Sequence, residues 1–94
     1  MAPEVKAGLL AVAAKVFWWG GPEEALADLP RFVAQVMTYG DWEDVTRTLR
    51  ALGEQAFADV LDHPPPGVFD EKSWNYWHLW CGRSPVPPLP NRQL

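Results

Sequence analysis

Hydrophobic residues recur at helical spacing along most of this chain, and no stretch of strand length alternates between polar and apolar positions. Glycine, proline and acidic residues of the kinds that begin and end helices separate the periodic segments. Besides a short helical turn at 22–27, the pattern predicts helices at residues 3–17, 29–39, 42–52, 54–62 and 71–81. Because the connections are short, neighbouring helices must pack at steep angles. We therefore expect an all-α fold, a compact orthogonal bundle of about five short helices.

The most aromatic of these helices lies between Phe69 and Gly82 and has clear signals at both ends. Asp70 is placed to cap its first turn, Phe69 and Trp74 fit a hydrophobic staple, and Gly82 fits a left-handed stop. Trp74 and Trp77 fall on one face of the helix. We expect this helix to be buried, with both tryptophans as structural anchors, and the rest of the domain to be organised around it.

A second set of capping signals surrounds Asp41. This residue is placed to cap the helix that follows it, and Asp44 completes a capping-box pair three residues later. Helical periodicity puts Trp42 on the inward face as a further anchor, and it puts Glu43, Asp44 and Arg47 on the outward face. Because acidic residues are stabilised in the first turn of a helix, capping explains this acidic cluster better than metal binding or acid–base chemistry.

The 94 residues, of which 48% are hydrophobic, suffice for one modest core, so we expect a single helical domain at 1–84. The run Pro-Val-Pro-Pro-Leu-Pro then begins a proline-rich extended tail at 85–94, which fits the spacing of a polyproline ligand. A single cysteine excludes an internal disulfide, and the apolar run at 8–14 is too short to span a bilayer. These features predict a cytoplasmic protein without a membrane segment.

Twelve acidic residues against eight basic ones give a net charge of -4, and the basic residues are scattered. Without a basic run to bind phosphates, we do not expect nucleic acid as a partner. The helices at 42–52 and 54–62 have the length of a helix-turn-helix, but the second contains Glu54, Asp59 and Asp62 and no lysine or arginine. The length of this helix pair makes a dimeric DNA-binding regulator the alternative interpretation of the chain, and the acidic second helix makes it the less favoured one.

No combination of residues predicts catalysis or a bound ion. His78 and Cys81 lie one helical turn apart, but structural zinc usually has four ligands, and here a fourth would have to be an acid. Cys81 is in the last turn of its helix, where the helix dipole disfavours a thiolate nucleophile. We expect no catalytic residue, no metal ligand and no cofactor.

The chain has six tryptophans, more than the two or three that a core of this size accommodates. Large aromatic residues in excess of the needs of the core tend to gather at interfaces, where an acidic surface suits a basic protein partner. The candidate partner surface comprises Trp80, Tyr76, Trp19, Glu43, Asp44 and Arg47. Either another protein or a second copy of the chain would bind there.

Several segments together resemble a family of small uncharacterised bacterial all-helical proteins. The segments are Phe17-Trp18, Phe32-Val33, Val36-Met37, Tyr39-Gly40-Asp41-Trp42-Glu43-Asp44, Leu49, Leu52-Gly53, Val60-Leu61 and Trp74-Asn75-Tyr76-Trp77-His78-Leu79. They span roughly residues 16–82, and the chain departs from the family pattern at Trp19-Gly20-Gly21 and in its triple proline. Members of that family are commonly encoded beside nucleotidyltransferase-type toxins of the abortive-infection kind. The resemblance implies a non-enzymatic protein-interaction domain, the antitoxin-like partner of such a toxin.

Overall fold

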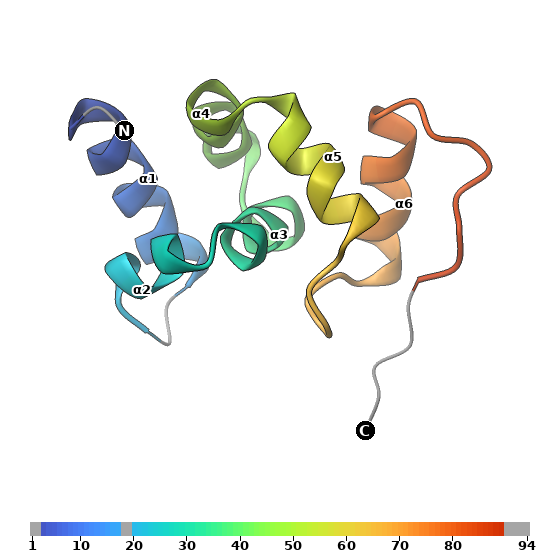
Figure 1. The fold of residues 1–94 in the computed structure, drawn as a ribbon, viewed down its shortest axis with the longest axis horizontal. Coiled ribbons are helices and arrows are strands. Elements are labelled where there is room, and N and C mark those ends of the chain that lie inside the picture. Colours follow the sequence, from blue (N-terminus) through green and yellow to red (C-terminus); the bar gives the residue numbers. More distant parts are fainter. Residues whose placement is uncertain (1–2, 18–19, 90–94) are drawn as a thin grey trace.

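The computed structural model of the chain describes residues 3–17 and 20–89. Within these ranges the chain forms helices and no strands, which confirms the predicted all-α fold (Figure 1). The helices are α1 (Pro3–Val16), α2 (Pro22–Ala27), α3 (Leu29–Tyr39), α4 (Trp42–Leu52), α5 (Glu54–Asp62) and α6 (Glu71–Trp80). The helical turn expected at 22–27 is α2, a helix of six residues.

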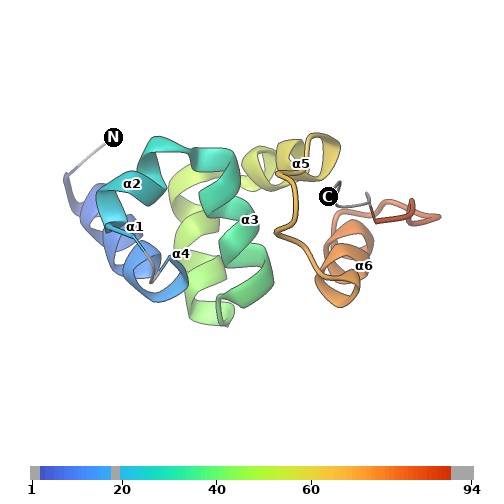
Figure 2. The same cartoon turned by 90° about the horizontal axis from the view of Figure 1, so that it is seen from below.

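The helices cross steeply. In Figure 1, α3 and α4 are seen nearly end-on, whereas α1, α5 and α6 lie across the view. Turned by 90°, α3 and α4 run side by side, with α1 and α2 at one end of the molecule and α5 and α6 at the other (Figure 2). The centre of the bundle is α3, which contacts each of the other helices of the described chain. The expectation that the domain is organised around the aromatic helix is therefore wrong, because α6 contacts only α3 and α5.

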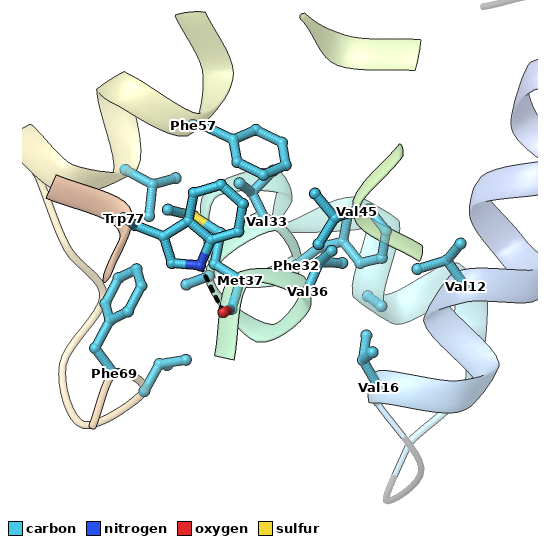
Figure 3. Packing of buried hydrophobic residues seen from close by; sticks show 14 of the residues in the cluster. Val12, Val16, Phe32, Val33, Val36, Met37, Val45, Phe57, Phe69 and Trp77 are labelled. Atoms are coloured by element: carbon cyan, nitrogen blue, oxygen red, sulfur yellow. Dashed lines mark hydrogen bonds between the residues drawn. The ribbon is translucent and has the colours of Figure 1, made fainter. Parts of the chain in front are cut away.

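The core is built on both sides of α3 (Figure 3). Phe32, Val33, Val36 and Met37 are all at most 5% exposed, so they present apolar surface in two directions. On one side they meet the buried valines of α1, and on the other they meet Phe57, Phe69 and Trp77. A helix whose central turns are buried on all sides can join two flanking pairs of helices into one hydrophobic core.

Trp77 fastens α6 to α3. Its indole Nε1–H donates a hydrogen bond of 2.7 Å to the carbonyl of Met37, and its ring lies 5.3 Å from that of Phe57 (Figure 3). Met37 is in the last turn of α3, where backbone carbonyls have no partner within the helix. The prediction that Trp77 and Trp74 are structural anchors is confirmed, since each is 3% exposed.

The predicted ends of α6 are also confirmed. The side chain of Asp70 accepts a hydrogen bond of 2.7 Å from the backbone N–H of Ser73, and this bond lowers the pKa of Asp70. After the helix, Gly82 has a φ of 74°, its N–H donates to Leu79, and the next N–H, that of Arg83, donates to His78. This pair of bonds is a Schellman motif, and it requires the left-handed conformation that glycine adopts without strain.

Trp42 is not the inward-facing anchor that periodicity predicted, because its side chain is 61% exposed. The buried face of α4 is formed by Asp44, Val45 and Thr48. Side chains on a helix lean towards its N-terminus, so Trp42, at the first helical position, projects past the end of α4 instead of onto its neighbours. Tyr39 is similarly exposed, at 65%, and the two rings flank the junction between α3 and α4.

Gly8 lies inside α1 at a place where a side chain would fit. A methyl group built on its α-carbon would meet no other atom within 4 Å. Glycine within a helix destabilises it relative to alanine because its backbone loses more conformational freedom on folding. We expect Gly8→Ala to raise the free energy of unfolding by about 0.5–1 kcal/mol. Urea denaturation followed by circular dichroism measures this, and a destabilised variant would contradict the geometry of α1.

Candidate protein-binding surfaces

A groove of about 400 Å³ opens on the surface between α3 and α5, where the two helices lie next to each other. Its wall is apolar except for Asp59 and His63. The groove, called the α3–α5 groove below, is lined by Leu29, Pro30, Val33, Leu52, Ala56, Asp59, Val60 and His63. Its volume lies within the range of ligand pockets, about 300–1,000 Å³, and an open apolar depression is a default candidate for a binding site.

The local sequence explains why this groove stays open. Asp28 caps α3 by accepting a hydrogen bond of 3.3 Å from the N–H of Arg31, and Pro30 occupies the first turn, where no helical N–H partner is needed. Leu29 therefore sits at the very start of α3 and Leu52 at the very end of α4. Leu52 is partly buried against the core, and Leu29 remains 36% exposed.

The polar part of the groove is acidic. Asp59 accepts a hydrogen bond of 2.8 Å from the side chain of Gln55, which holds its carboxylate along α5. His63 ends the helix, with its N–H bonded to the carbonyl of Asp59. Of the other acidic residues on this helix, Asp62 is ion-paired with Arg83 and Glu54 lines a different depression, so Asp59 is the carboxylate on the groove wall. Positive charge on a ligand is therefore favoured along this side of the groove.

The predicted partner surface divides into two separate places. Tyr76 is half exposed on α6, and Trp80 is partly buried, with its ring 5.1 Å from that of Trp77. Glu43 and Arg47 are exposed on α4, where their side chains form an ion pair of 2.9 Å. In the described chain α4 and α6 share no contact, so these residues do not make one continuous surface. Trp19 lies outside the described residues.

The structure contradicts the prediction that Asp44 belongs to the partner surface. Its side chain is 3% exposed, because it turns back under the N-terminus of α4 instead of facing out. Asp41 and Asp44 form the predicted capping box, with hydrogen bonds of 2.9 and 3.1 Å from each backbone N–H to the other side chain. The Lys15 ammonium on α1 lies 3.1 Å from both carboxylates. The sequence pattern predicts the capping box but not the contact with Lys15, which lies on another helix 26 residues before Asp41.

The cluster shifts the pKa values of Lys15 and Asp41 in the directions expected of an ion pair. The backbone N–H of Asp44 and then the Lys15 ammonium hold the pKa of Asp41 below its ordinary value of 3.8. Hydrogen bonds to Asp41 and Asp44 raise the pKa of Lys15 above its ordinary value of 10.5. The ion pairs of Lys15 with the two aspartates make the cluster a structural link between α1 and α4.

His78 and Cys81 do not come together as a reactive pair. His78 is 2% exposed, and its Nδ1 lies 2.8 Å from the carbonyl of Trp74, so this nitrogen must hold a proton and donate it. Burial raises the pKa of the Cys81 thiol above its ordinary value, which disfavours the thiolate. Among residues 3–17 and 20–89, no three or more histidine, cysteine or acidic side chains are grouped as metal ligands would be.

Comparison of the chain with protein-family models, with curated proteins and with solved structures gave no match in any of the three. None of the described helices is both long enough and apolar enough to cross a membrane.

Proposed function

We propose that this chain is a non-enzymatic protein-interaction domain and that it binds a protein partner in the α3–α5 groove. The observation that supports this most strongly is the apolar wall of the groove, which is open at the surface of the bundle. Apolar grooves between helices typically receive the apolar face of a partner helix. Its volume admits several side chains, so the groove offers an anchoring pocket of the kind that dominates interface energetics.

The charges around the groove favour a partner with basic residues beside its apolar anchor. Asp59 lies on the groove wall, and no lysine or arginine is among the described residues that line the groove. Opposite charges at the rim of an interface guide association and exclude wrong partners, even where they add little affinity. The acidic helix α5 would repel the phosphates of duplex DNA, so a protein partner is favoured over the DNA-binding alternative.

The resemblance to a family encoded beside nucleotidyltransferase-type toxins indicates which protein to look for. A nucleotidyltransferase binds nucleotide or RNA in a cleft that needs positive charge. An acidic domain whose groove binds an apolar segment of the partner next to that cleft would cover it and block access. We therefore propose an antitoxin-like role in which this chain inhibits its partner by occlusion, without any reaction of its own.

A tagged pull-down from the source cell at moderate salt tests this proposal, read by mass spectrometry and light scattering. Recovery of a nucleotidyltransferase-fold protein in stoichiometric amount is the expected result. Recovery of the tagged chain alone, as a monomer, would contradict a protein-interaction role. Recovery of a defined homodimer would contradict the antitoxin role and leave self-association as the use of the groove.

A further inference from the structure

The segment that follows α6 folds back onto the helix. The indole Nε1–H of Trp74 donates a hydrogen bond of 2.8 Å to the backbone carbonyl of Pro87. On either side of this bond, Val86 and Leu89 are partly buried and pack against the hydrophobic core. Pro88, between them, is exposed. The chain thus places apolar side chains at positions i and i+3 against the core, while residues 84, 85, 87 and 88 are exposed.

The surface beneath this segment is aromatic and rigid. The ring of Phe69 packs edge-on to that of Trp74 at 5.5 Å, and the imidazole of His78 lies 4.2 Å from it on the other side. The hydrogen bond from His78 Nδ1 to the Trp74 carbonyl fixes the imidazole in turn. We call Phe69, Trp74 and His78 the Trp74 shelf.

The contacts on this shelf are those by which proline-rich ligands are recognised. Such a ligand has few backbone N–H groups, so its carbonyls must find donors on the receptor, and it loses little conformational entropy on binding. A tryptophan that is buried along its rings but has an N–H at its edge supplies both the apolar contact and the donor. Here Trp74 donates to the carbonyl of Pro87, and Val86 and Leu89 pack against the hydrophobic core to which Phe69 and Trp74 belong.

We propose that the Trp74 shelf is a binding site for proline-rich segments of the type Val-Pro-Pro-Leu. In the isolated chain it holds its own residues 86–89, and it accepts the same segment from a second copy when its own segment is displaced. A segment tethered by a few residues has an effective concentration in the millimolar range. The tethered segment therefore competes with any added ligand and controls access to the shelf. This proposal is independent of the α3–α5 groove.

The test uses a synthetic peptide with the sequence of residues 84–89 and full-length chains. In the variant Val86→Ser/Leu89→Ser, the tethered segment keeps its length but loses both apolar anchors. The peptide should bind this variant and shift one indole N–H resonance in the NMR spectrum, that of Trp74. The wild-type chain should bind the peptide at least about tenfold more weakly, since a shelf that is nine-tenths occupied lowers apparent affinity by that factor.

The matched controls are Trp74→Phe and Trp80→Phe in the same background. Because Trp74→Phe lacks the reporter resonance, binding to both variants is measured by isothermal titration calorimetry. Removing the indole donor at residue 74 should abolish binding of the peptide, while the same change at residue 80 should leave it intact. If the double variant does not fold, Leu89→Ser alone replaces it, and millimolar peptide on the wild-type chain must shift the same resonance. Absence of binding to every folded variant, or binding that survives Trp74→Phe unchanged, would overturn the proposal.

Discussion

Replacement of Trp77 by alanine is expected to unfold the domain or nearly so. The side chain is 3% exposed and joins α6 to both α3 and α5 through its hydrogen bond to Met37 and its contact with Phe57. Removing a buried tryptophan costs about 3–5 kcal/mol, because apolar contacts are lost and a cavity remains. Small domains have only about 5–15 kcal/mol of stability in total. Thermal denaturation followed by circular dichroism should show a melting temperature at least about 12 °C lower.

Trp77→Phe separates packing from hydrogen bonding. Phenylalanine retains most of the apolar surface but leaves the Met37 carbonyl without its donor at the end of α3. An unsatisfied buried polar group costs about 1–3 kcal/mol, so this variant should lie between wild type and Trp77→Ala. A Trp77→Ala variant that melts within 2–3 °C of wild type, on the order of 0.5 kcal/mol, would contradict the placement of Trp77 in the core.

The second large effect is a difference in stability between variants of Asp44 and Glu43. Helical periodicity assigns both of these neighbouring acidic residues to the outward face of α4. Asp44→Ala should destabilise the domain by about 1.5–3 kcal/mol, because the buried carboxylate makes charge-assisted hydrogen bonds to the Asp41 N–H and to Lys15. Glu43→Ala should change stability by less than about 0.5 kcal/mol, since its ion pair with Arg47 is exposed. Urea denaturation of both variants measures the difference.

Equal effects of the two substitutions would contradict the structural link that Lys15, Asp41 and Asp44 form between α1 and α4.

The comparison also bears on the design of binding experiments. Reversing Asp44 to lysine would place a buried positive charge beside Lys15, so a loss of binding in that variant would report a disturbed fold. Glu43 is the acidic residue of α4 whose charge can be reversed to test a surface role.

The helix ends were the most predictable part of this fold. Asp41, Asp70 and Gly82 act within four or five residues of their own position, and such local hydrogen bonds depend only on the nearby sequence. The all-α class followed from periodicity for the same reason. Lys15 could not be placed in the same way, because its partners come from a helix whose approach is set by the packing of the whole bundle.

Burial at the edges of the bundle was harder to predict than burial at its centre. The aromatic content of α6 suggested a central helix, yet α3 occupies the centre with smaller residues that are buried on both sides. Helical periodicity assigned Trp42 to the inward face, but its position at the first turn of α4 leaves it 61% exposed. Residue type gives a preference for burial, and the position of an element in the fold determines it.

The α3–α5 groove was beyond prediction from the sequence. Leu29 and Leu52 look like ordinary core residues, and the groove is lined by residues of α3, α4 and α5 that only the packing of the bundle brings together. One signal was available, since both leucines adjoin a helix terminus, where coverage by neighbouring helices is least. The acidic character of α5, in contrast, could be predicted directly from its residues.

The measurement that tests the central claim most directly is the affinity of the recovered partner for two variants of α5. Ala56 lies on the wall of the groove, while Ala58 is equally half-buried but lines a different depression, beside α6. By isothermal titration calorimetry, Ala56→Lys should weaken binding at least about tenfold, equivalent to 1.4 kcal/mol, because its side chain fills the groove. Ala58→Lys should bind like wild type. Equal affinities of the two folded variants would contradict binding in the α3–α5 groove.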